Sequence, residues 1–139
     1  MNNILEIEGL TKSYDGKKKA LNDCNFFLKK GEICAIVGES GSGKTTLLRL
    51  IAGLERPNNG CIKINNKIVS SNTRITPPQK RQIGMVFQDY ALFPHMTVEE
   101  NISFGLKKPG ASEIENLLSL IKMDAYGKSY PSELSGGQE

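Results

Sequence analysis

The eight residues from Gly38 to Thr45, GESGSGKT, restrict the possible folds of this chain more than any other stretch. They fit the pattern G-x-x-x-x-G-K-[ST], in which glycines let the backbone adopt positive φ and approach a ligand closely. The N–H groups of such a loop converge on an anion, and the helix that follows adds the positive end of its dipole. The motif is therefore typical of triphosphate binding, with Lys44 reaching the β- and γ-phosphates and Thr45 ligating Mg²⁺.

The segments on both sides of this loop agree with that interpretation. The apolar run EICAIVG, residues 32–38, predicts a strand buried on both faces. The segment KTTLLRLIAGL predicts a helix, with Gly53 as its stop signal and with apolar residues at helical spacing, namely Leu47, Leu48, Ile51 and Leu54. We expect the phosphate-binding residues to be Gly38, Glu39, Ser40, Gly41, Ser42, Gly43, Lys44, Thr45 and Thr46.

Alternating apolar and polar residues predict further strands. Ile4 to Ile7 alternate clearly, and NDCNFFLKKGE does so more weakly before it ends at Gly31. Asn59–Gly60 is a strong turn signal, after which Ile62, Ile64 and Ile68 alternate. The run RQIGMVFQ, residues 81–88, is another short candidate for a buried strand.

The second half of the chain has helical signals. Thr97 with Glu100 and Ser112 with Glu115 have the spacing of capping boxes. One predicted helical face carries four apolar residues, Ile114, Leu117, Leu118 and Ile121. The order of elements predicts an α/β core with an antiparallel flank.

Composition narrows the function classes. A chain of 139 residues has room for one domain at most. A net charge of +3, carried in short lysine clusters, is too weak to indicate a nucleic-acid partner. Three cysteines without a C-x-x-C pair argue against a disulfide framework or a zinc site. The N-terminus does not resemble a secretory signal, and no apolar run reaches the roughly 18 residues of a membrane span.

A small GTPase would share the phosphate-binding loop but needs D-x-x-G and N-K-x-D as well. Residues 124–127 read DAYG, but they follow an amphipathic helix. Asn66 and Lys67 are followed by Ile68 and Val69 rather than by x-D. The GTPase interpretation therefore fails at base recognition.

Three motifs in order carry a resemblance to a known family: the loop at 38–45, the stretch VFQDYALFPHMTVEENI around Gln88, and LSGGQ at 134–138. Over essentially its whole length the chain resembles the ATP-binding subunit of an ABC transporter. The stretches TPPQKRQIGMVFQ and YALFPHMTVEENISFGL look most like importers of ferric iron, polyamines, sulfate or sugars, with ferric iron and polyamine favoured.

The resemblance implies a P-loop NTPase core of the RecA-like α/β class. It also implies an N-terminal antiparallel β subdomain, residues 1–31 and 60–70, and the start of a helical subdomain, residues 96–139. The core would comprise residues 32–59 and 81–95. The subunit would be peripheral, on the cytoplasmic face of the cell membrane.

The resemblance also assigns roles to single residues. Tyr14 matches the aromatic residue that stacks on adenine, and its alternative role is that of a strand-end tyrosine. Gln88 matches the glutamine that joins the Mg²⁺ sphere and senses the γ-phosphate, and its alternative role is that of a polar cap. Lys44 and Gln88 would thus be the catalytic residues, and Thr45 and Gln88 the metal ligands.

Residues 89–104 match the surface on which the family docks its membrane permease subunit. Four of them would form an apolar patch, or alternatively core: Tyr90, Leu92, Phe93 and Pro94. His95, the one histidine, lies in this segment, and we expect a structural or interface role for it rather than a catalytic one.

In the family, two ATPase subunits face each other head to tail, and each LSGGQ closes on the partner's γ-phosphate. The residues that match this role are Ser135, Gly136, Gly137 and Gln138.

Hydrolysis in the family needs a further strand that ends in Asp and Glu, but no Asp–Glu dipeptide occurs in this sequence. The catalytic Glu and the switch His that follow LSGGQ in the family are absent as well. We therefore expect a chain truncated after LSGGQ, with weak ATP·Mg²⁺ binding at best and without turnover. A non-hydrolysing regulatory module and a non-functional remnant are the alternatives. We also expect the loss of neighbouring strands to expose the edges of the strand at 32–38.

Overall fold

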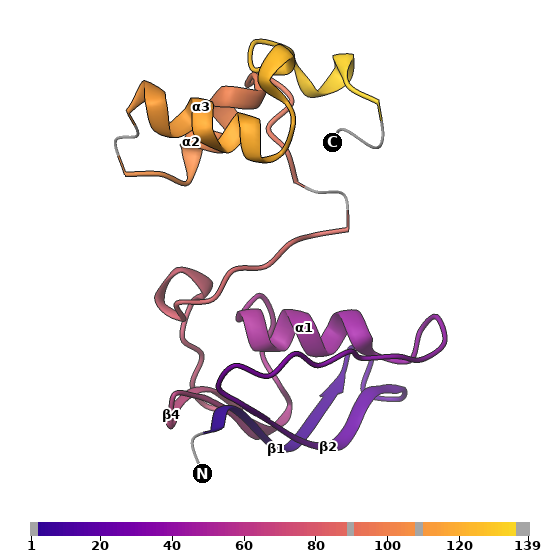
Figure 1. Ribbon diagram of the computed structural model, residues 1–139. Helices are drawn as coiled ribbons and strands as arrows, with labels where there is room; N and C mark the ends of the chain where they lie inside the picture. The colour runs from indigo at the N-terminus through magenta and orange to yellow at the C-terminus, as the bar shows by residue number, and fades with distance from the viewer. Residues whose placement is uncertain (1–2, 89–90, 108–109, 136–139) are drawn as a thin grey trace. The chain divides into compact units, whose positions relative to one another are not determined.

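The computed structural model describes residues 3–88, 91–107 and 110–135 (Figure 1). The chain divides into two compact units, Met1–Met85 and Val86–Glu139. Each unit has a hydrophobic core of its own, and each is described by itself below.

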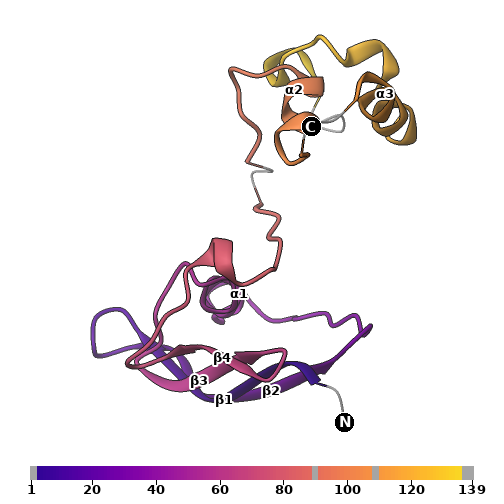
Figure 2. The ribbon, with the colours of Figure 1, turned by 90° about the vertical axis from the view of Figure 1, so that its left-hand side faces the viewer.

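The first unit is a four-stranded antiparallel sheet with one helix packed on it. Its strands are β1 (Asn3–Ser13), β2 (Lys19–Lys29), β3 (Asn59–Ile64) and β4 (Lys67–Ser71), in the order β2-β1-β3-β4. The helix α1 (Lys44–Ala52) lies across one face of this sheet (Figure 2). The predicted strand at Ile4–Ile7, the alternation at Ile62 and Ile64, the helix after the glycine-rich loop and the antiparallel flank are therefore confirmed. Ile68, predicted to continue the alternation, lies in β4 and is 46% exposed.

The core of the first unit lies between α1 and the sheet. Its seven buried residues are Ile7, Leu10, Leu47, Leu50, Ile62, Ile64 and Val69. In α1, Leu47 and Leu50 belong to this core, Ile51 packs against it, and Thr46 and Ala52 are buried as well. Leu48 and Leu54, predicted for the same face, are 46% and 47% exposed.

The turn between β3 and β4 lies at Asn65–Asn66, and the prediction of a turn at Asn59–Gly60 is wrong. Both asparagines have positive φ, 48° and 60°, as a two-residue type I′ turn requires. Gly60 instead lies in β3 with φ of 82°. A Cβ there would overlap the carbonyl oxygens of Glu8 and Gly9, so glycine allows the backbones of the paired strands β1 and β3 to approach closely where their register shifts.

The two strands predicted at 32–38 and 81–88 are absent from the described part of the chain. Ile33 is fully exposed and Val86 is 85% exposed. A strand buried on both faces needs hydrogen-bonded neighbours along both edges. The four described strands pair only with one another, so these apolar runs have no described partner.

A buried cation joins the end of α1 to the sheet. Arg81 is 3% exposed, and its guanidinium donates five hydrogen bonds to neutral acceptors. Burial lowers the pKa of this guanidinium. The acceptors are the carbonyl oxygens of Leu50, Ile51, Val69 and Thr76 and the hydroxyl of Ser70, at 3.0, 2.8, 3.1, 2.7 and 2.6 Å. Two of these carbonyls lie at the C-terminus of α1, where the helix dipole favours a cation.

The second unit contains two short helices, α2 (Val98–Phe104) and α3 (Ala111–Leu120). The 3₁₀ turns η2 (Asp124–Tyr126) and η3 (Pro131–Glu133) follow them, whereas η1 (Pro78–Lys80) belongs to the first unit. The buried core of the second unit consists of Val98, Leu118 and Met123. Three partly buried residues pack against it, namely Ile102, Ile114 and Leu134. This core is much smaller than that of the first unit.

One of the two predicted capping boxes is confirmed. The N–H of Glu100 donates to the Thr97 hydroxyl at 3.4 Å, and the N–H of Thr97 donates to the Glu100 carboxylate at 2.7 Å. The box at Ser112–Glu115 is wrong, because the N-cap of α3 is Gly110, two residues before Ser112. Ile121, predicted for the buried face of this helix, follows its last turn and is 53% exposed.

In the three stretches that the structure covers, no helix combines the length and the apolar character needed to cross a bilayer.

Candidate functional site

The glycine-rich loop ends at the first turn of α1. Gly41 and Gly43 have φ of 80° and 95°, a region that side chains other than glycine rarely adopt. Gly43 is the N-cap of α1, and its carbonyl accepts the first helical hydrogen bond from the N–H of Leu47 at 2.9 Å. Because the cap is a glycine, the first-turn N–H groups face no capping side chain.

Close approaches fix the two ends of this loop. A Cβ on Gly43 would overlap the carbonyl oxygen of Ala20 and lie 3.1 Å from Leu21 Cδ2, so the loop packs directly on β2. A Cβ on Gly38 would lie 2.8 Å from Ser42 Oγ. The loop therefore folds back tightly on itself, as the motif predicts.

Lys44 turns its ammonium group back over the loop. Its Nζ donates hydrogen bonds to the carbonyl oxygens of Gly38 and Glu39, both at 2.7 Å, and to Ser42 Oγ at 3.2 Å. A phosphate oxygen carries a full charge and is a stronger acceptor for an ammonium than a neutral carbonyl oxygen. A triphosphate at the loop would therefore compete well for this lysine.

The neighbouring threonines differ in their surroundings. Thr45 is exposed, so its hydroxyl is accessible to a ligand, whereas Thr46 is buried. Among residues 3–88, 91–107 and 110–135, no three His, Cys, Asp or Glu side chains are grouped as a metal site. One threonine hydroxyl fits Mg²⁺ that takes its other oxygen ligands from phosphates and water.

Tyr14 follows the end of β1, and its side chain is linked to α1. The Tyr14 hydroxyl lies 2.8 and 2.7 Å from the two carboxylate oxygens of Glu55, and 3.2 Å from the Thr46 hydroxyl. The residue is 61% exposed, and Lys12 Nζ lies over its ring, 5.1 Å from the centroid. Burial, with a contribution from Glu55, raises the pKa of Tyr14, although its contact with Thr46 opposes this.

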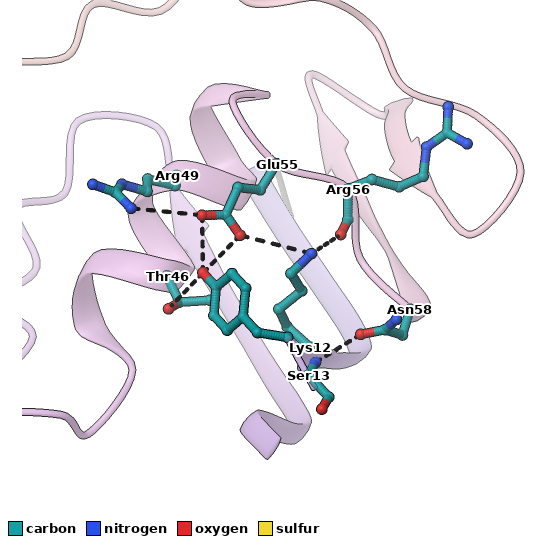
Figure 3. Close-up of polar contacts among 8 residues, drawn as sticks. Lys12, Ser13, Thr46, Arg49, Glu55, Arg56 and Asn58 are labelled. Atoms are coloured by element: carbon teal, nitrogen blue, oxygen red, sulfur yellow. Dashed lines mark hydrogen bonds and ion pairs between the residues drawn. The ribbon is translucent and has the colours of Figure 1, made fainter. Parts of the chain in front are cut away.

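Glu55 is the centre of these contacts. Figure 3 shows it among Lys12, Thr46 and Arg49, and its carboxylate oxygens lie 3.7 Å from both cationic groups. The same Lys12 ammonium donates to the carbonyl oxygen of Arg56 at 2.9 Å. The network thus joins β1, α1 and the segment after α1 beside the glycine-rich loop.

The remaining predicted site residues belong to the second unit. Gln88 is exposed, and so is Ser135. Gly136, Gly137 and Gln138 lie outside the described residues. The structure thus brings Tyr14 and the loop residues together in one unit and describes Gln88 and Ser135 in the other.

The predicted docking segment, residues 89–104, is partly buried and partly exposed where the structure describes it. Leu92 and Phe93 are half-buried, Pro94 is exposed, and residues 89–90, which include Tyr90, lie outside the described residues. The His95 ring packs edge-on against Phe93, with the centroids 6.0 Å apart. The side chain of Asn101 fixes this segment to α2 through four hydrogen bonds, two of them to the backbone of Phe93.

Sequence reasoning missed Glu55, Arg81 and Asn101. Each is a single polar residue without a motif, and a solvated surface position is the usual interpretation of such a residue. Their partners are distant in sequence or are backbone groups, so only the fold reveals them.

Comparison with known proteins extends this description. The family described as "ABC transporter" matches residues 21–139. Putrescine transport ATP-binding protein PotG of Escherichia coli (strain K12) is 48% identical over 141 residues, which cover 97% of this chain and 36% of PotG. Sulfate/thiosulfate import ATP-binding protein CysA of Bacillus cereus is 46% identical over 144 residues, which cover 96% of this chain and 39% of CysA. The chain spans well under half the length of these relatives.

A solved structure agrees with the sequence matches. It is the dimeric, post-hydrolysis state of the ATP-binding cassette MJ0796 bound to ADP and Pi. It is 30% identical to this chain, with a TM-score of 0.75, and covers 96% of this chain and 64% of its own. These likenesses confirm the predicted P-loop NTPase fold of the α/β class. Because the family match extends over most of its residues, the chain belongs to the ABC transporter family, within the ATP-binding cassette.

Proposed function

We propose that this chain binds ATP with Mg²⁺ and that a complete subunit containing it couples ATP hydrolysis to solute import through separate permease subunits. The observation that supports this most is the Lys44 ammonium, 2.7 Å from two carbonyl oxygens of the glycine-rich loop at the start of α1. This places a positive charge, a helix N-terminus and close-approaching backbone at one point. Residues 38–46 would hold the phosphates, and Tyr14 would stack on adenine.

The metal would bind through oxygen ligands only. We assign Thr45 and Gln88 to it, and when bound it would neutralise charge on the phosphates. Lys44 would donate hydrogen bonds to the β- and γ-phosphates, whereas the neutral Gln88 amide would report on the γ-phosphate without adding charge.

The partner assignments rest on the family. We propose a head-to-tail dimer in which Ser135, Gly136, Gly137 and Gln138 close on the partner's γ-phosphate. The dimeric state of MJ0796 supports this. We propose further that residues 89–104 dock a permease at the cytoplasmic face of the membrane. Polyamine, which PotG's name favours, is the first cargo to test, followed by ferric iron. No nucleic-acid partner is proposed.

We retain three subdomains as part of this proposal. They are a β subdomain at 1–31 and 60–70, a P-loop core at 32–59 and 81–95, and a helical subdomain at 96–139.

A second candidate function is nucleotide binding without turnover by the 139 residues alone. The lack of any Asp–Glu dipeptide supports it, because the family's general base is a Glu that follows an Asp. A steady-state ATPase rate that disappears in Lys44→Ala would contradict this second candidate.

Calorimetric titration with ATP·Mg²⁺ tests the binding proposal. We expect Lys44→Ala to weaken binding about 10- to 100-fold, because a charged hydrogen bond is worth ~1.5–3 kcal/mol. Lys30→Ala is the matched control, since it removes an exposed lysine outside the loop. Equal affinities of Lys44→Ala and Lys30→Ala, with both variants folded by circular dichroism, would refute the proposed site.

A further inference from the structure

We propose that Glu55 is a positioning residue of the nucleotide site, which holds the Tyr14 ring on α1 so that affinity for the base depends on it. This inference rests on the proposed function, since it assigns the adenine-stacking role to Tyr14. Three observations support it: the hydrogen bonds of the Tyr14 hydroxyl, the two cations that hold Glu55 in place, and the position of Lys12 over one face of the Tyr14 ring.

The first observation is that the Tyr14 ring is mostly exposed and is fixed at its hydroxyl. It is 61% exposed and follows the end of β1, so burial does little to hold the ring, and the hydrogen bonds of its hydroxyl are its link to α1. That hydroxyl is 2.7–2.8 Å from the Glu55 carboxylate oxygens and 3.2 Å from the Thr46 hydroxyl. Because Thr46 is in the first turn of α1, the anchor ties the ring to the helix that follows the phosphate loop.

The second observation is that Glu55 is itself held in place. Its side chain is 16% exposed, and cations from two elements lie 3.7 Å from it, Lys12 of β1 and Arg49 of α1. Two cations face one carboxylate, so this acceptor adds no net negative charge beside a polyanionic ligand. Hydrogen bonds to a charged acceptor are stronger than neutral ones, so Glu55 is a better anchor than Thr46.

The third observation concerns the two faces of the ring. The Lys12 ammonium lies over the Tyr14 ring, 5.1 Å from its centroid. A cation in this position is attracted by the ring and occupies one face. The opposite face is therefore the one offered to a base. With the hydroxyl fixed, the ring presents this face in one orientation, which lowers the ordering entropy that stacking must overcome.

The test compares a ligand that has a base with one that lacks it. Binding of ATP·Mg²⁺ and of inorganic tripolyphosphate with Mg²⁺ is measured on the full chain by calorimetry. We expect Glu55→Ala to weaken ATP binding about three- to tenfold and to leave tripolyphosphate binding within about twofold. Glu55→Gln keeps an oxygen that can accept from the phenol, so it should restore part of the loss.

A double-mutant cycle shows whether Glu55 acts through the Tyr14 hydroxyl. Tyr14→Phe keeps the ring but removes the anchor, and it should match Glu55→Ala in ATP affinity. The double variant should then be no weaker than either single variant. Glu115→Ala, which removes an exposed carboxylate from α3, is the control.

Each outcome has a defined meaning. Unchanged ATP affinity in Glu55→Ala, an equal loss for both ligands, or additive effects in the cycle would overturn the inference and leave the proposed function intact. Failure of the unaltered chain to bind ATP would overturn both. If Glu55→Ala unfolds, Tyr14→Phe and Glu55→Gln still decide, because both preserve the size and packing of the side chain.

Discussion

Replacing Arg81 by alanine tests whether one buried cation holds the first unit together. The change removes the guanidinium that joins the C-terminus of α1 to β4 and to the residues before η1. It leaves behind five acceptors, three of them in buried and two in partly buried hydrogen bonds. No carboxylate lies within ion-pair distance of this guanidinium among the described residues, so the loss is one of hydrogen bonds rather than of a salt bridge.

The magnitude follows from the acceptors that have no second donor. The carbonyl oxygens of Leu50 and Val69 also accept from backbone N–H groups, at 3.2 and 2.7 Å. The carbonyl oxygens of Ile51 and Thr76 and the hydroxyl of Ser70 depend more on the guanidinium. At about 1–3 kcal/mol for each buried acceptor left without a donor, the gross loss is at most roughly 3–9 kcal/mol, since water can reach two of the three acceptors in part. In the alanine variant, folding no longer has to desolvate a cation or order its long side chain, and this offsets part of the gross loss. We therefore expect the free energy of unfolding to fall by about 3–5 kcal/mol.

Urea unfolding followed by far-ultraviolet circular dichroism measures this loss. A unit of about 85 residues has roughly 4–13 kcal/mol of stability, so Arg81→Ala should remove much of it. Arg81→Lys keeps the charge but offers three donors instead of five, and we expect it to recover only part. Lys80→Ala, at the exposed neighbouring position, is the control. A free energy of unfolding for Arg81→Ala within ~0.5 kcal/mol of this control would refute the reasoning.

Three further changes probe other contacts. Gly53→Ala should destabilise the first unit by about 2 kcal/mol or more in urea, because φ is 84° there and a Cβ would lie 2.6 Å from Arg81 Cζ; a loss below ~0.5 kcal/mol would contradict this. Lys63 lowers the pKa of Glu8 below its ordinary 4.5, so this carboxylate stabilises the fold above pH 4.5 and ceases to do so as pH falls through the lowered pKa. Melting temperatures of Glu8→Gln should therefore fall less steeply below pH 4.5 than those of the unaltered chain. Asn101→Asp should lower the melting temperature of the second unit, since a carboxylate would face three backbone carbonyl oxygens that now accept from the amide; an unchanged value, with Asn101→Ala as comparison, would show the amide to be unimportant.

Local pattern was sufficient to predict the elements whose partners are close in sequence. The loop at 38–45 and the helix α1 follow from glycine spacing and helical periodicity, both of which are properties of short segments. The capping box at Thr97–Glu100 is equally local. The family, too, could be identified, because its three motifs are short and occur in a fixed order.

The errors occurred where structure depends on distant groups. The runs at 32–38 and 81–88 have the composition of buried strands, but a strand forms only beside another strand, and composition does not reveal whether one is available. The turn was assigned to Asn59–Gly60 because Asn-Gly is a strong turn signal, yet that glycine serves the close approach of the paired strands β1 and β3. Arg81 has the sequence signature of a surface cation, and only the assembled unit surrounds it with carbonyl oxygens.

The central position of β1 has a consequence for hydrogen–deuterium exchange. Since β1 is paired with β2 on one side and β3 on the other, opening its amides to solvent requires separating the sheet itself. In the sequence, the loop at 38–43 lies between β2 and α1 and has little backbone hydrogen bonding of its own. Its amides should therefore be among the fastest-exchanging amides of the unit. The same unit therefore contains slowly exchanging amides in β1 and rapidly exchanging amides in the loop. A bound nucleotide would be seen as new protection of the loop amides, with exchange in β1 unchanged.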